Sequence, residues 1–256
     1  MLKLLKGSFI RLFKSSEFQL IPFLLIISNV MIMLINRDSF EAMGIEPQTY
    51  LSHVLFHVMY INICIAAFTG LFVGTEYSDA TVFNKIIFGH SRTSVFFTYL
   101  LTCLFSAAFF NFAAILGSTA IGWIVLGEPS FGFGEVIKVY FQGLPPLFTV
   151  SSLHVMLAVL LQNRAVGTGV SCGLSSVMLF VSAYLNNESN MENMLYDLLP
   201  DFYLMRVVSA TEPATTGVAA EFNFPYFPIL LFVVFTIAGL LIFNNINIRN
   251  TPEGEV

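Results

Sequence analysis

The sequence has few charged residues. Of its 256 residues only 11% are charged, whereas 56% are hydrophobic, and the mean hydropathy is +0.80. Soluble domains carry about 25% charged residues, so this deficit argues against a soluble domain and predicts a membrane protein. The net charge of −5 gives no basis for nucleic-acid binding.

Motifs for nucleotide and metal chemistry are also missing. The sequence has no GxxxxGK[ST] loop and no HExxH pair, so we expect no catalytic residues and no ATP, metal ion or other cofactor bound by this chain. Cys64, Cys103 and Cys172 lie inside apolar runs without CxxC spacing, which favours packing roles over a disulfide framework or a metal site. His53 and His57 are four residues apart, but no third metal ligand accompanies them.

Six apolar runs are of the length that membrane spans require, or close to it. They lie near Gln19–Ile35, Tyr50–Val73, Val95–Leu126, Val139–Leu161, Ala165–Leu185 and Pro225–Ile246. This pattern predicts an all-α, polytopic membrane protein with six transmembrane helices in one domain, residues 19–250. The third run is long enough to be tilted, kinked or extended beyond the membrane, and Pro145-Pro146 should bend or delay the fourth.

Lysine and arginine indicate the orientation, because cytoplasmic loops are enriched in them. With the N-terminus inside, the cytoplasmic side holds Lys3, Lys6, Arg11, Lys14, Lys85, Arg92, Arg164 and Arg249. The outer side then holds Arg37, Lys138 and Arg206. We therefore expect both termini in the cytoplasm, with residues 251–256 as a cytoplasmic tail.

Residues 1–18 form a basic amphipathic segment. Its apolar side chains can share a face: Leu2, Leu5, Phe9, Leu12 and Phe13. We expect an interfacial helix that lies against anionic lipid at the cytoplasmic surface.

Polar side chains within the runs are mostly hydroxyls and amides, and ionisable residues at mid-span are scarce. His154 and Ser171 lie in adjacent runs and predict a hydrogen bond between two helices. The histidine precedes the serine in the chain, and Cys172 replaces the second glycine of a GxSG core, which argues against an intramembrane serine protease.

The segment Gly74–Ser94 is a polar interruption between the second and third runs. We expect one short amphipathic helix over residues 79–88, with Ser78 capping its start, Glu76 and Asp79 near its positive dipole end, and Gly89 ending it. Its apolar face comprises Val82, Phe83, Ile86 and Ile87. Such a helix is too short to span a bilayer. Its apolar face therefore needs a partner, which is either a separate cytoplasmic protein or the lipid surface.

At this segment the sequence resembles ABC-2 type permeases, the membrane subunits of bacterial ABC exporters. That family has a Glu-containing turn, a Gly-Thr, a basic helix and a Gly-x-Ser-Arg before the third span. The corresponding residues here are Glu76-Tyr77, Ala80-Thr81, Asn84-Lys85 and Gly89-His90-Ser91-Arg92, with Ala80 where glycine is common. Size and general pattern are most similar to the branch that exports, or confers immunity to, amphipathic peptides such as lantibiotics and phenol-soluble modulins.

The resemblance implies a complex in the bacterial cytoplasmic membrane. It would contain two permease subunits, identical or different, and two ATPase subunits that bind ATP and Mg²⁺. The helix 79–88 would be the coupling helix, seated in a groove of the ATPase. The residues expected to serve that contact are Glu76, Asp79, Val82, Phe83, Lys85, Ile86, Ile87 and Arg92.

The loop 186–224 would then be an extracellular gate, and the alternative is an ordinary packed outer loop. The scarcity of charge within the spans suits a hydrophobic or amphipathic cargo, such as a peptide, moved out of the cell or out of the membrane. The alternative function is a non-transporting immunity or sensor subunit that binds a peptide.

Overall fold

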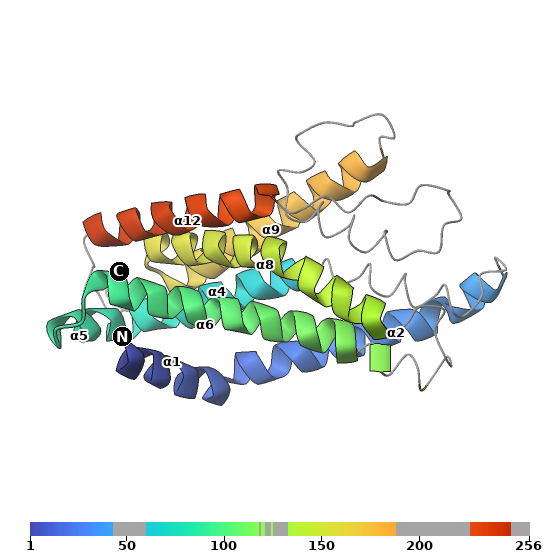
Figure 1. Ribbon diagram of the computed structural model, residues 1–256, viewed down its shortest axis with the longest axis horizontal. Coiled ribbons are helices and arrows are strands. Elements are labelled where there is room, and N and C mark those ends of the chain that lie inside the picture. The colour runs from blue at the N-terminus through green and yellow to red at the C-terminus, as the bar shows by residue number, and fades with distance from the viewer. Residues whose placement is uncertain (43–59, 118, 121–123, 125–132, 188–225, 247–256) are drawn as a thin grey trace.

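The computed structural model describes residues 1–42, 60–117, 119–120, 124, 133–187 and 226–246. All regular structure in these residues is helical, which confirms the predicted all-α class (Figure 1). The helices are α1 (Leu2–Lys14), α2 (Ser16–Ala42), α4 (Ile61–Ser78), α5 (Thr81–Ile87), α6 (Arg92–Phe112), the π-helical turn η2 (Ala113–Gly117), α8 (Phe133–Leu161), α9 (Arg164–Asn187) and α12 (Tyr226–Asn245).

Five helical segments have the length and the apolar composition needed to cross a membrane. They are Ile61–Ser78, Arg92–Gly117, Val136–Leu161, Arg164–Ser182 and Tyr226–Asn245, and the apolar stretch Ser16–Met31 is shorter. A membrane-embedded protein is therefore supported, while six spans and cytoplasmic termini stay predictions. Most of the predicted gate loop 186–224, the tail 251–256 and the pair His53 and His57 lie outside the described residues.

The two irregular spans follow from their sequences. The long third run is α-helical to Phe112 and then widens into the π-helical turn η2, a feature that commonly bends helices. The helix α8 continues through Pro145 and Pro146 and changes direction along its length (Figure 1). The prolines thus bend this span, as expected, without ending it.

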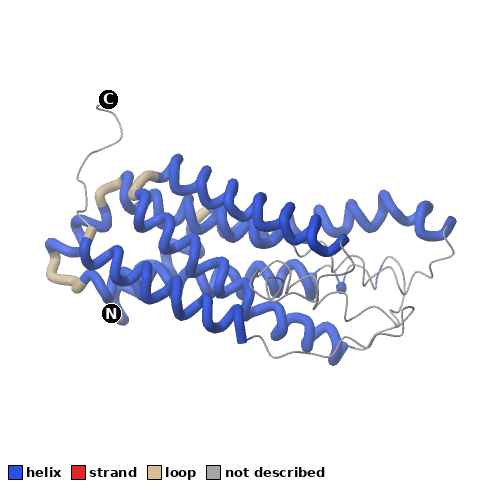
Figure 2. The backbone as a smooth tube through the Cα atoms, turned by 90° about the horizontal axis from the view of Figure 1, so that it is seen from above, coloured by secondary structure: helices blue, strands red, loops and turns tan. Residues whose placement is uncertain are grey.

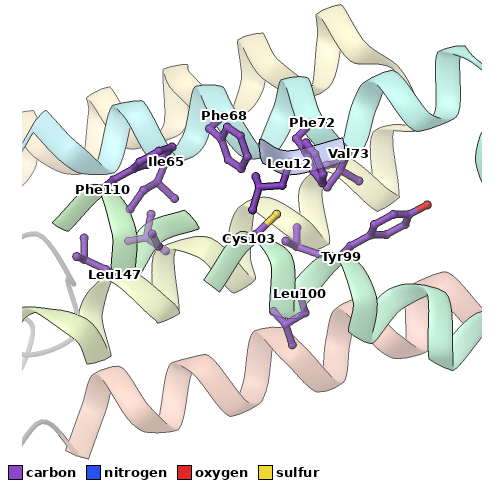
Figure 3. Close-up of a cluster of buried hydrophobic side chains, with 14 of the residues drawn as sticks. Leu12, Ile65, Phe68, Phe72, Val73, Tyr99, Leu100, Cys103, Phe110 and Leu147 are labelled. Atoms are coloured by element: carbon purple, nitrogen blue, oxygen red, sulfur yellow. The ribbon is translucent and has the colours of Figure 1, made fainter. Parts of the chain in front are cut away.

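The helices run side by side along the long axis (Figure 2). The helices α4 and α8 contact each other, and both contact α6 and α9. The most extensive contacts join α12 to α8 and α4 to α9. Of the apolar window in α4, 67% is buried, whereas only 17% of that in α12 is buried. The core between α1, α4, α6 and α8 contains Leu12, Phe68, Cys103 and Leu147 (Figure 3). The outer helices α9 and α12 therefore present apolar faces to the surroundings of the bundle.

Two glycines let α4 and α9 approach closely. A Cβ added at Gly70 would lie 2.6 Å from the Cα of Thr168, and one added at Gly74 would lie 2.7 Å from the Cα of Arg164. Their G-x-x-x-G spacing is a known device for helix contact in membranes. The spacing is a local sequence signal, since residues four apart share one face of a helix.

The helix α1 runs beside α6 (Figure 1). Its buried face comprises Leu4, Ser8 and Leu12, and Phe9 stacks edge-on to Phe105 with ring centroids 5.1 Å apart. Of the predicted apolar face, Leu12 is buried in the bundle, whereas Leu2 is 83% exposed, and Leu4, which lies outside that face, is buried. Contact of this face with lipid stays a prediction. Contacts with α6 select the buried face, and helical periodicity alone does not reveal them.

Most of the basic side chains that the structure describes lie toward one end of the bundle. The helices α4, α8 and α12 end there, and α1, α6 and α9 begin there (Figure 1). The residues concerned are Lys3, Lys6, Arg11, Lys14, Lys85, Arg92 and Arg164. We call this the basic end.

The close approach at Gly70 predicts a large effect for a small substitution. Gly70→Ala should lower the free energy of unfolding by about 1–3 kcal/mol, because the new methyl group meets the backbone of α9. Gly173→Ala is the matched control, since no atom lies within 4 Å of its added Cβ, and it should be neutral or stabilising by up to about 1 kcal/mol. Thermal unfolding in detergent, followed by circular dichroism, measures both. Equal effects of the two substitutions would contradict this account of the contact.

Candidate functional site

The predicted short helix is present as α5, Thr81–Ile87, inside the expected range 79–88. It connects the end of α4 to the start of α6 at the basic end (Figure 1). The expected start was wrong. Ser78 is the last residue of α4, and the N-cap of α5 is Ala80, which makes no side-chain cap hydrogen bond. Glu76 therefore lies in the last turn of α4 and not at the start of α5.

Ala80 adopts a backbone conformation that favours glycine. Its φ of 52° and ψ of 17° lie in the left-handed region, which costs a residue with a Cβ roughly 1–2 kcal/mol. This conformation turns the chain sharply between α4 and α5. The resemblance places glycine at this position.

The end of α5 is a Schellman motif, and it confirms the predicted stop at Gly89. Gly89 has φ 85°, its N–H donates to Ile86 O at 3.0 Å, and the N–H of His90 donates to Lys85 O at 3.2 Å. The next residues begin α6. The Ser91 hydroxyl oxygen accepts a hydrogen bond from Ser94 N at 3.2 Å, as an N-cap does.

Arg92 caps the C-terminal end of α12. Its Nη1 lies 3.1 Å from Phe243 O, 3.1 Å from Asn244 O and 2.7 Å from Ile246 O, at the end of α12. A guanidinium at this position satisfies terminal carbonyls and complements the helix dipole. Gly89, Ser91 and Arg92 thus fix α5, α6 and α12 relative to one another within four residues.

A buried carboxylate forms the centre of this end of the protein. Glu76 is 1% exposed and forms ion pairs with Arg11 of α1 and Lys85 of α5. The hydroxyl of Tyr99 in α6 donates a hydrogen bond to the same carboxylate. Four elements therefore meet at one side chain. We call Arg11, Glu76, Lys85 and Tyr99 the Glu76 cluster.

Further contacts hold the two cations of the Glu76 cluster. The Arg11 guanidinium donates to Phe72 O at 2.8 Å, and its Cζ lies 4.6 Å from the centroid of the Phe72 ring. Lys85 Nζ lies 5.0 Å from the centroid of the Tyr99 ring. Burial lowers the pKa of the Lys85 ammonium, and the Glu76 carboxylate opposes that shift.

The residues expected to contact a partner fall into two groups. Glu76 and Val82 are buried, and Phe83, Lys85, Ile86 and Arg92 are partly buried. The exposed ones are Asp79 and Ile87, with Ile87 63% exposed. Phe88, which the sequence analysis did not select, is 81% exposed. The apolar surface of α5 that is open to contact is thus its C-terminal tip, Ile87 and Phe88.

The other polar site expected from the sequence is a contact between α8 and α9. His154 Nε2 lies 2.8 Å from Ser175 Oγ, and both side chains are buried. The predicted kind of contact is present, but the predicted partner Ser171 was wrong by one helical turn. Among the described residues no group of three or more His, Cys, Asp or Glu side chains is arranged to hold a metal ion.

Glu76→Gln should destabilise the protein, because it leaves Arg11 and Lys85 without their counter-charge. Both cations are partly exposed, at 34% and 16%, so we expect a loss of up to about 3 kcal/mol rather than the full penalty of a dry ion pair. Glu17→Gln is the control: Glu17 is 35% exposed and lies 3.9 Å from Arg164, and its loss should cost less than about 1 kcal/mol. Chemical denaturation in detergent compares the two, and equal losses would refute the assigned role of Glu76.

Ala80→Gly should raise the free energy of unfolding, whereas most substitutions by glycine lower it. Relief of the left-handed strain, partly offset by the flexibility of glycine in the unfolded chain, should stabilise the protein by about 0.5 kcal/mol. Ala165→Gly, at an exposed helical position in α9, should destabilise it by up to about 1 kcal/mol. The same denaturation assay tests both. A loss of stability from Ala80→Gly equal to that of Ala165→Gly would contradict the strain.

A search with models of known protein families finds no match to the chain, and a search of curated proteins finds none either. The resemblance to ABC-2 type permeases therefore rests on the residues quoted above, and the function is argued from the geometry of α5 and its surroundings.

Proposed function

We propose that this protein is the membrane permease subunit of an ATP-driven exporter in the bacterial cytoplasmic membrane, and that α5 transmits motion from a separate ATPase subunit. One observation carries the proposal. The helix α5 is fixed to the bundle on one side, through Val82 and Lys85, and exposes Ile87 and Phe88 at its tip. Exposed apolar anchors on a rigid support are typical of protein contact sites.

The attachment of α5 suits a lever. A push on Ile87 and Phe88 acts on Lys85 through less than one helical turn, and Lys85 is paired with Glu76 of α4. The chain after α5 leads at once to Arg92, which holds the end of α12. A force on the tip would therefore reach α4, α6 and α12 together. A helix that only rests on lipid would not need such connections.

The charge distribution supports a cytoplasmic position for α5. The basic end contains seven lysine and arginine side chains, Lys3, Lys6, Arg11, Lys14, Lys85, Arg92 and Arg164. Cytoplasmic surfaces of membrane proteins carry this excess. An ATPase in the cytoplasm could then reach Ile87 and Phe88.

The chemistry of the spans bears on cargo and assembly. The buried polar groups in the described spans are mainly hydroxyls, amides and one histidine, which suits a hydrophobic or amphipathic cargo such as a peptide. The exposed apolar faces of α9 and α12 can pack against lipid or a second permease subunit. ATP and Mg²⁺ would be bound by the ATPase, since transport in this scheme takes its energy from that partner.

Phe88→Asp tests the proposal. It places a carboxylate in the expected apolar contact, where an unpaired charge costs several kcal/mol, so binding of the proposed partner ATPase should weaken at least about tenfold. A titration of the purified protein in nanodiscs with that ATPase measures the affinity. The rate of ATP turnover that the protein stimulates gives a second readout.

Thr93→Asp is the matched control, because Thr93 is exposed in the first turn of α6 and lies outside α5. It should leave both readouts within about twofold of the native protein. Unchanged affinity and turnover with Phe88→Asp would refute the docking role of the tip. An intact complex that moves no peptide into vesicles would favour the immunity or sensor function instead.

A further inference from the structure

A pocket of about 260 Å³ lies between α1, α2, α4 and α9 at the basic end. Three cations line it, Arg11, Lys14 and Arg164, together with one carboxylate, that of Glu17. These four side chains come from three different helices. The pocket therefore exists only in the folded bundle and carries a net positive charge.

The carboxylate neutralises little of this charge. Glu17 Oε1 lies 3.9 Å from Arg164 Nη2, and both side chains are more than a third exposed, so their pairing is weak. Arg11 is shared with Glu76. Lys14 is exposed and makes no ion pair within the described part of the chain. Lys14 and Arg164 are thus the two cations free to meet an incoming anion.

Two helix dipoles add to the field of the side chains. The helix α2 begins at Ser16 and α9 begins at Arg164, and residues from the first turn of each line the pocket. The positive ends of both dipoles therefore lie at the pocket, and the negative C-terminal end of α1, at Lys14 and Ser15, offsets part of their field. Anions bind readily at such helix starts when basic side chains accompany them.

The rest of the surroundings is apolar. Phe68 and Leu71 of α4 form part of the wall. Beyond the pocket, α2 exposes Phe23 at 60% and α9 exposes Val166 at 50%. A free phosphate ion has no apolar part that could be buried against such surfaces. An anion that carries acyl chains can place its charge among the cations and its chains along the exposed helices.

We infer that this pocket binds the phosphate group of an anionic phospholipid, such as phosphatidylglycerol. Basic pockets between membrane helices are a recurrent way to hold anionic headgroups. The inference is independent of whether α5 binds an ATPase. A phosphate in the pocket competes with Glu17 for Arg164. Loss of a cation should therefore weaken phosphate binding, and loss of the Glu17 carboxylate should strengthen it.

Native mass spectrometry and thermal unfolding in detergent test the site with phosphatidylglycerol, phosphatidylcholine and inorganic phosphate as probes. Phosphatidylglycerol should bind and raise the unfolding temperature, and phosphatidylcholine should not. The double variant Lys14→Gln, Arg164→Gln should bind phosphatidylglycerol at least about tenfold more weakly, because it removes both free cations. Lys6→Gln is the control, since Lys6 is exposed on α1 but does not line the pocket, and it should bind as the native protein does.

Glu17→Gln gives a readout that misfolding cannot imitate. It removes the competing carboxylate, so phosphatidylglycerol should bind more tightly, by about twofold or more. Equal affinity of the native protein and the double variant would overturn the assignment. It would also be overturned if inorganic phosphate alone reproduced the stabilisation and phosphatidylglycerol added nothing, since the occupant would then be a free anion.

Discussion

The basic end of this protein is built around one buried carboxylate that requires its partners. Glu76 lies at 1% exposure in the last turn of α4, where the helix dipole disfavours a negative charge. Without Arg11 and Lys85 the burial of this charge would be prohibitive. The requirement fixes α1, α5 and α6 around the end of α4. The ion pair of Lys85 with Glu76 attaches the short helix α5 to α4, in addition to the chain segments that precede and follow α5.

Helix ends provide the second constraint. Between Ala80 and Arg92 the chain makes a left-handed turn, a Schellman motif and an N-cap, and then contributes a guanidinium to the end of α12. Each device satisfies backbone groups that a helix end leaves without partners. Several of the residues that carry the resemblance to ABC-2 type permeases thus shape or cap helix ends in this chain. Part of that short motif encodes the geometry of α5, whatever partner α5 meets.

Local patterns predicted the local features of this fold. The apolar runs predicted the helices, the polar interruption predicted α5, and Gly89 predicted its end. The predictions that failed concerned contacts between different helices. Sequence spacing assigned Glu76 to the dipole of α5, since it could not show that Arg11, 65 positions earlier in the sequence, would pair with it. It likewise named Ser171 as the partner of His154, whereas the partner is Ser175, one helical turn further along the same face of α9. The pocket beside α1 combines side chains from four helices, and a local sequence pattern cannot predict such a combination.

Arg11 belongs to the Glu76 cluster and also lines the pocket between α1, α2, α4 and α9. A buried ion pair adds little net stability compared with apolar packing of the same volume, so the cluster is better understood as a device that fixes positions. An anion in the pocket attracts the guanidinium that Glu76 also holds. If an anion binds there as proposed, Arg11 would turn toward it, Glu76 would depend more strongly on Lys85, and α5 would be held more tightly against α4. With both proposals combined, the charge of the surrounding lipid would change how firmly α5 is held against α4.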